Sequence, residues 1–129
     1  MPDSSAITQG IKVDVISDYV PSRSNPINSE YFFVYRVTIT NEGAEPARLV
    51  SRHWIITNSE GDEEHVRGPG VVGETPYLEP GDVFTYTSAC PLKSPVGAMR
   101  GTYQMVRDNG WMFDAEIAAF TLAMPYAIN

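Results

Sequence analysis

Cysteine is nearly absent from this chain. Cys90 is the only one among 129 residues, so an internal disulfide cannot form and a zinc site built from four cysteines is excluded. A chain without an internal disulfide is typical of a reducing compartment. Residues 1–7 also lack the basic start and the apolar run of a secretory signal. We therefore expect a cytoplasmic protein.

Positive charge and long apolar runs are also scarce. The chain has 9 Lys and Arg against 16 Asp and Glu, so its net charge is −7. Affinity for nucleic acid comes mainly from basic side chains that neutralise phosphates, so nucleic acid is not an expected partner. No stretch approaches the roughly 18 apolar residues that a membrane-spanning helix needs, and no membrane partner is expected.

Helical periodicity is almost missing, and an alternation of apolar and polar residues takes its place. Strand side chains point to opposite faces in turn, so every second residue from Tyr31 to Ile39 shares one face. We interpret that aromatic and branched face as core rather than as a ligand-binding surface. Clusters of Gly, Pro, Asn and Asp end each run, which is typical of antiparallel strands joined by turns.

These runs predict one all-β domain that spans residues 1–129, with residues 1–8 expected to be flexible. The strand-like runs are 11–15, 31–40, 47–57, 65–67, 83–89, 98–107 and 112–122. A chain of this length can bury a core without disulfides or metals. We expect a β-sandwich of the immunoglobulin or fibronectin type III style, with about seven to eight antiparallel strands.

Several segments resemble the ApaG family, in the order in which that family carries them. They are 51–57, 66–73, 78–81, 86–88, 90–93, 97–106 and 113–114, with Ile117 and Phe120 after them. The resemblance implies a fibronectin type III-like sandwich, found alone in bacteria and as a domain of eukaryotic F-box and polymerase-interacting proteins. It implies no settled activity; the genetic associations of the family are with cobalt and magnesium tolerance and with a neighbouring gene for a dinucleoside tetraphosphate hydrolase. The occurrence of the domain in F-box and polymerase-interacting proteins suggests a role in protein interaction.

A glycine-rich segment, residues 68–73, has the GxGxxG spacing of the dinucleotide fingerprint, whose glycines let the backbone approach a pyrophosphate at a helix N-terminus. A helix should follow, but Val71 and Val72 are β-branched and Pro69 offers no N–H. We predict instead a bend at the rim of the sandwich, with glycines at positive φ. Arg67 beside it could still receive a small anion or a partner's carboxylate.

Metal binding and catalysis have few candidate residues. His53 and His65 are equally far from Ser59, so they could face each other across a hairpin. Two nitrogens fall short of the three or four ligands of a tight transition-metal site, so no metal site is predicted. Cys90 has no neighbouring base in the sequence and is interpreted as buried and structural. No other catalytic pattern appears, so we expect neither enzymatic activity nor a cofactor.

The sequence therefore favours a binding module, with protein–protein interaction as the leading hypothesis and the partner unidentified. The candidate binding residues are Arg52, Arg67, Gly68, Pro69, Gly70, Gly73 and Arg100. A homodimer is also considered, through an unprotected strand edge or through the hairpin at Trp111. The alternative is a small-ligand protein that binds pyrophosphate, a nucleotide or a divalent cation and serves metal or nucleotide homeostasis.

Overall fold

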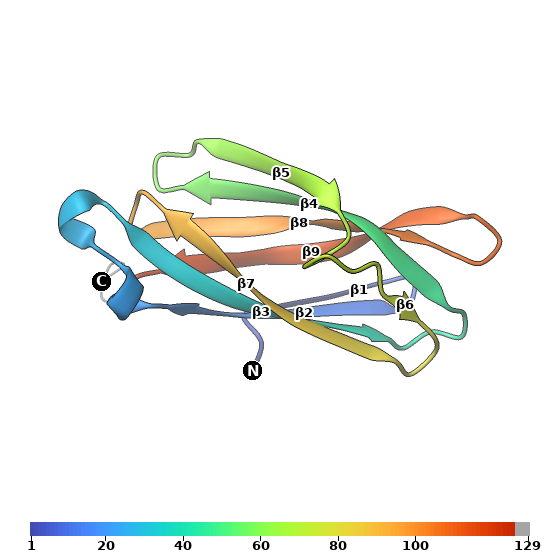
Figure 1. The fold of residues 1–129 in the computed structure, drawn as a ribbon. Helices are drawn as coiled ribbons and strands as arrows, with labels where there is room; N and C mark the ends of the chain where they lie inside the picture. Colours follow the sequence, from blue (N-terminus) through green and yellow to red (C-terminus); the bar gives the residue numbers. More distant parts are fainter. Residues whose placement is uncertain (126–129) are drawn as a thin grey trace.

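The computed structural model describes residues 1–125, in which two antiparallel sheets pack face to face (Figure 1). The first sheet has the order β1 (Ser4–Thr8), β2 (Ile11–Tyr19), β3 (Tyr31–Asn41) and β7 (Val83–Leu92). The second has the order β5 (Glu63–Pro69), β4 (Ala47–Asn58), β8 (Val96–Val106) and β9 (Met112–Ala123), and β6 (Tyr77–Leu78) also pairs with β4. The predicted all-β sandwich is confirmed.

In the described part of the chain, helical structure is confined to two short turns between β2 and β3. They are the 3-10 helices η1 (Pro21–Arg23) and η2 (Pro26–Asn28). Within residues 1–125, no helix has the length and apolar character needed to cross a bilayer.

The N-terminal segment differs from the flexible tail expected for residues 1–8. Strand β1 pairs with β2 along its whole length, through a tight turn in which Gln9 and Gly10 have φ of 51° and 82°. The Asp3 carboxylate also accepts a hydrogen bond from the Ser17 N–H at 2.6 Å. Gln-Gly is not among the dipeptides that mark a two-residue hairpin most strongly, which is why the sequence did not predict this strand.

The core follows the alternation of β3. Phe33, Val37 and Ile39 are at most 1% exposed and Tyr35 is 6% exposed, so this face is interior as predicted. From the opposite sheet, Trp54 packs with its ring centroid 5.3 Å from that of Tyr35. Aromatic side chains on alternate positions of the two sheets thus fill the space between them.

A β-bulge in β4 decides which residues of that strand face the core. Leu49 and Trp54 are both buried, although strict alternation would put them on opposite faces. The register with β8 shifts between Leu49 and Ser51, which leaves Val50 as the extra residue and changes the alternation. As a result Arg52 and Trp54, which alternation puts on one face, lie on the same side of the sheet as Leu49.

The two sides of the sandwich are closed to different extents. On one side β1 and β2 lie against β9, and Thr8 Oγ1 accepts a hydrogen bond from the Glu116 N–H at 3.0 Å. On the other side β5 and β7 are edge strands that do not pair with each other within the described residues. A cleft of about 290 Å³ separates them, with Tyr35, Trp54 and Val66 among its lining residues. The glycine-rich segment lies at the end of β5, on this open side.

Candidate functional site

The glycine-rich segment forms a two-residue hairpin at the rim of the sandwich. Val71 and Glu74 exchange backbone hydrogen bonds of 2.9 Å in both directions, and Val72 and Gly73 between them have φ of 44° and 81°. Positive φ at both central residues is the pattern of a type I′ turn. The predicted bend is therefore confirmed, and no helix follows it. We call residues 68–74 the rim loop.

Three backbone N–H groups of the rim loop donate to backbone carbonyls. The Gly70 N–H donates to the Val50 carbonyl at 2.9 Å, while those of Val71 and Glu74 close the hairpin. Gly70 has φ of 57°, and a Cβ at this position would lie 2.3 Å from the Glu74 carbonyl oxygen. A phosphate cradle needs several N–H groups that converge on a ligand, and these three already have carbonyl partners.

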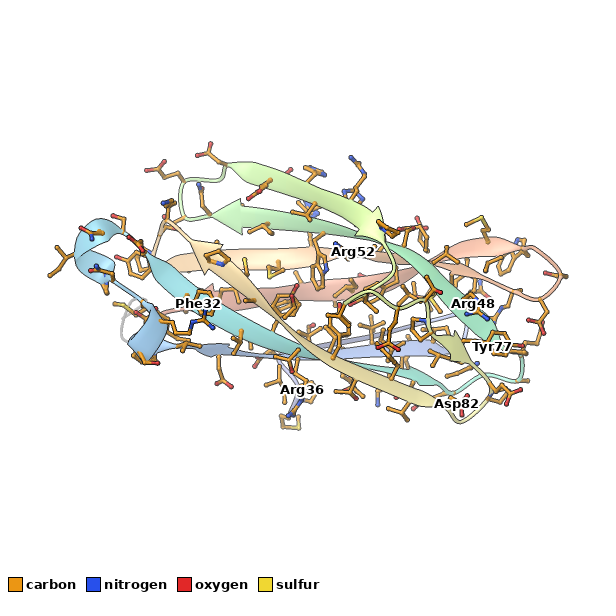
Figure 2. The ribbon with its side chains drawn as sticks, viewed as in Figure 1. Phe32, Arg36, Arg48, Arg52, Tyr77 and Asp82 are labelled. Atoms are coloured by element: carbon orange, nitrogen blue, oxygen red, sulfur yellow. The ribbon has the colours of Figure 1, made fainter. Side chains whose placement is uncertain are left out.

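Arg52 holds the rim loop from the inner side of β4. Its Nη1 donates to the Pro69 carbonyl at 2.9 Å and to the Gly70 carbonyl at 3.0 Å. Gly68 lies against the same guanidinium, since a Cβ there would be 2.9 Å from Nη2. Figure 2 labels Arg52 on β4, next to the segment that follows β5. Arg52 is therefore a brace for the loop.

Arg67 and the two histidines lie on the outer face of the second sheet. The register pairs Arg67 with His53 and His65 with Ile55, so the histidines are diagonal neighbours and not directly opposite as expected. The reason is that the turn is centred one residue later, with the Asn58 N–H bonded to the Asp62 carbonyl. His53 Nε2 and His65 Nδ1 nevertheless lie 2.8 Å apart, as hydrogen-bond partners.

The electrostatics of this face favour neutral histidine at position 53. Partial burial lowers the pKa of His53, and nearby Arg67 and His65 lower it further, while Asp114 acts in the opposite direction. A hydrogen bond between two imidazoles needs one acceptor nitrogen, which a neutral ring supplies.

Metal binding gains no support from this pair. Both facing nitrogens are engaged with each other at 2.8 Å, whereas a tetrahedral zinc ion with bonds of about 2.0–2.1 Å holds its ligand atoms roughly 3.3 Å apart. In residues 1–125, no three His, Cys, Asp or Glu side chains are grouped so that they could hold a metal ion.

Arg100 lies apart from the rim loop. It sits on β8 opposite Ile55, and its Nη2 donates to Glu63 Oε2 at 3.0 Å, with both side chains nearly half exposed. Among the predicted binding residues, Arg52, Arg67, Gly68 and Pro69 line one surface depression, and Arg52 also bonds to the Gly70 carbonyl. Arg100 belongs to an ion pair further along the sheet.

Cys90 has the environment of a structural thiol. It is 3% exposed and carries no disulfide. Burial raises its pKa to about 11, and the Glu64 carboxylate adds to the rise. The reactive thiolate is thus disfavoured near neutral pH, in agreement with the interpretation of Cys90 as buried and structural.

Sequence reasoning did not find Val72, which stands at the tip of the rim loop. Its side chain is 56% exposed, although its φ is positive. A β-branched residue at positive φ is rare, so no sequence pattern would place valine there. Only the Gly73 that follows it is a usual signal of such a turn.

Two antiparallel sheets that pack face to face define a small β-sandwich of the fibronectin type III and immunoglobulin style. Comparison with known proteins identifies the family. The model of the ApaG domain matches residues 21–107. Protein ApaG of Anaeromyxobacter dehalogenans (strain 2CP-C) is 54% identical over 126 residues, covering 98% of this chain and 99% of the relative. The chain belongs to the ApaG family.

Solved structures agree with this assignment. The crystal structure of the ApaA protein from Bordetella pertussis has 52% sequence identity and a TM-score of 0.87, and the match covers 90% of this chain and 94% of that one. The C-terminal domain of wzt matches with a TM-score of 0.55 at 15% identity, which shows a shared fold only.

Proposed function

We propose that this member of the ApaG family is a non-enzymatic module that binds another protein through Arg67 and the rim loop. The observation that carries this proposal is Val72, an exposed apolar side chain at φ of 44°. The left-handed region costs an L-residue with a Cβ roughly 1–2 kcal/mol. Strain of this kind persists where the surrounding structure imposes it, and it often occurs at functional positions.

The chemistry of the surface suits a protein better than a phosphate. The Arg67 side chain is exposed, and its guanidinium has no hydrogen-bond or ion-pair partner among residues 1–125. Arginine is enriched at interfaces and among the residues that contribute most of their binding energy. Because Arg52 fixes the loop carbonyls, the surface is already ordered, which reduces the entropy lost on binding.

The absence of catalysis is part of the proposal, and the environments of the nucleophile and base candidates support it. The Cys90 thiol is buried with a raised pKa. The His53 and His65 rings lie on the outer face of the second sheet and bond to each other. The Cys90 thiol and the two histidines therefore do not form the nucleophile–base pair that covalent catalysis needs. We place the interaction in the cytoplasm, where a free cysteine is normal.

The proposal is tested by capture from cell extract with tagged protein and quantitative mass spectrometry. Arg67→Ala and Val72→Asn are expected to lose the captured partner. Arg36→Ala is the matched control, because Arg36 is an exposed arginine on β3 that points away from the second sheet (Figure 2). Equal recovery with all three variants would remove the rim loop as the binding surface. Gly70→Ala is unsuitable here, because its Cβ would deform the loop.

A further inference from the structure

The edge strand β7 differs from the other edges of the sandwich. Natural edge strands are usually short, charged, interrupted by proline or covered, which prevents them from pairing with another chain. β1 is short and lies against β9, and β5 carries charged residues and ends at Pro69. β7 has 10 residues and no charged side chain, and its only proline, Pro91, stands near its end. Figure 1 shows β7 in gold, crossing the front of the view.

The free backbone groups of β7 follow from the ladder with β3. The Asn41 N–H donates to the Asp82 carbonyl at 3.0 Å. Every second pair that follows in the register, such as Ile39 with Phe84, is therefore also a hydrogen-bonded pair. In an antiparallel ladder the N–H and C=O groups of successive residues point alternately toward and away from the neighbouring strand. The groups that point away from β3 belong to Val83, Thr85, Thr87 and Ala89, and their side chains are exposed.

We propose that β7 pairs antiparallel with β7 of a second copy of this chain, about a two-fold axis at Tyr86. In this register Thr85 lies opposite Thr87 of the second copy, and Val83 lies opposite Ala89 of the second copy. Each pair exchanges two N–H···O bonds, using the groups that β3 leaves free. An isologous interface needs a surface that is complementary to itself, and this strand fulfils that condition.

The lack of charge on β7 decides where two copies can meet. The chain has a net charge of −7, so two copies repel each other overall, and contact is least opposed along a strand that carries no charge. The uncharged β7 is a strand along which two backbones can approach without opposing carboxylates. Cross-strand pairs of β-branched residues such as threonine also stabilise antiparallel sheets. The pairing uses neither Arg67 nor Val72, so it is independent of the proposed function.

The experiment is sedimentation equilibrium of the full chain from low micromolar to millimolar concentration, combined with amide hydrogen exchange by NMR. We expect the mass to rise from 14.3 kDa toward twice that value. The amides of Thr85 and Thr87 should exchange at least several-fold more slowly at the high concentration. Thr87→Lys should abolish both effects, since an edge lysine opposes pairing. Thr121→Lys, the same change at an exposed position of β9, should retain both.

A second variant separates loss of pairing from loss of folding. Ala89→Pro removes an N–H that points away from β3, and Pro91 already occupies the same kind of position two residues later. It should melt near the wild type and still remain monomeric. A wild type that stays monomeric at every concentration would overturn the proposal. So would a dimer that survives Thr87→Lys and Ala89→Pro, or a monomer whose Thr85 amide is protected only by another protein's strand.

Discussion

Val72→Asn should make the protein more stable while it weakens binding. Val72 and Gly73 occupy the central positions of the rim hairpin at φ of 44° and 81°. Asparagine tolerates positive φ, and Asn-Gly is the dipeptide that this turn type prefers. Removing most of the roughly 1–2 kcal/mol that the left-handed conformation costs valine should outweigh the small loss of apolar burial, because the side chain is already 56% exposed. We expect a net gain of about 1 kcal/mol.

The gain is measurable as a shift in thermal midpoint. An unfolding entropy of about 2.1 cal/mol/K per residue, taken over 129 residues, converts 1 kcal/mol into an increase of about 4 °C. Differential scanning calorimetry at one pH measures it. Val83→Asn is the control, since Val83 is 58% exposed in a strand and asparagine is disfavoured there. A Val72→Asn midpoint at or below that of the wild type would refute the hairpin geometry.

Other perturbations test the rim loop and the core separately. Gly70→Ala should destabilise the protein by at least about 1–2 kcal/mol, because its Cβ would lie 2.3 Å from the Glu74 carbonyl oxygen; an unchanged urea midpoint would contradict this contact. Cys90 should resist alkylation at pH 8 in the folded state. Its raised pKa also predicts that stability is lost between pH 9.0 and about 11, because the unfolded thiol releases its proton first, and urea titrations with Cys90→Ala as control should show a smaller loss in the variant. Pyrophosphate and Co²⁺ should cause no saturable amide shifts in residues 67–73, and saturable shifts there would support the small-ligand alternative.

The fold was largely predictable because alternation determines which face of a strand is buried. The β3 residues Phe33 and Ile39 are interior as the pattern requires. What escaped prediction was short or irregular. β1 is joined to β2 by a Gln-Gly turn that carries no strong hairpin signal, and β6 has only two residues. The bulge at Val50 is invisible in the sequence, since an extra residue is recognised only from its pairing partners.

The position of the candidate site could be predicted from the sequence, but the contacts of its individual residues could not. The bend after Arg67 followed from glycines and from the absence of a helix-forming segment. The role of Arg52 did not, because it depends on the bulge that turns this side chain to the inner face. Arg100 was grouped with the loop from its charge alone, whereas the register places it diagonally across from Glu63. Which residues of different strands become neighbours depends on the pairing register, which the sequence of one strand does not give.

The GxGxxG spacing itself has a physical cause here that involves no phosphate. Gly68 leaves room for the Arg52 guanidinium, and Gly70 allows the chain to pass the Glu74 carbonyl. Gly73 completes the hairpin at positive φ. Three separate backbone requirements thus produce the spacing of a nucleotide fingerprint, and all three act on the shape of one loop. If that account is correct, the glycines serve to present Val72, and replacing the arginine that braces them should affect partner binding without any direct contact. Arg52→Lys tests this step: lysine keeps the charge but cannot match the planar guanidinium that bridges two carbonyls, so partner recovery should fall although Arg67 and Val72 are unchanged.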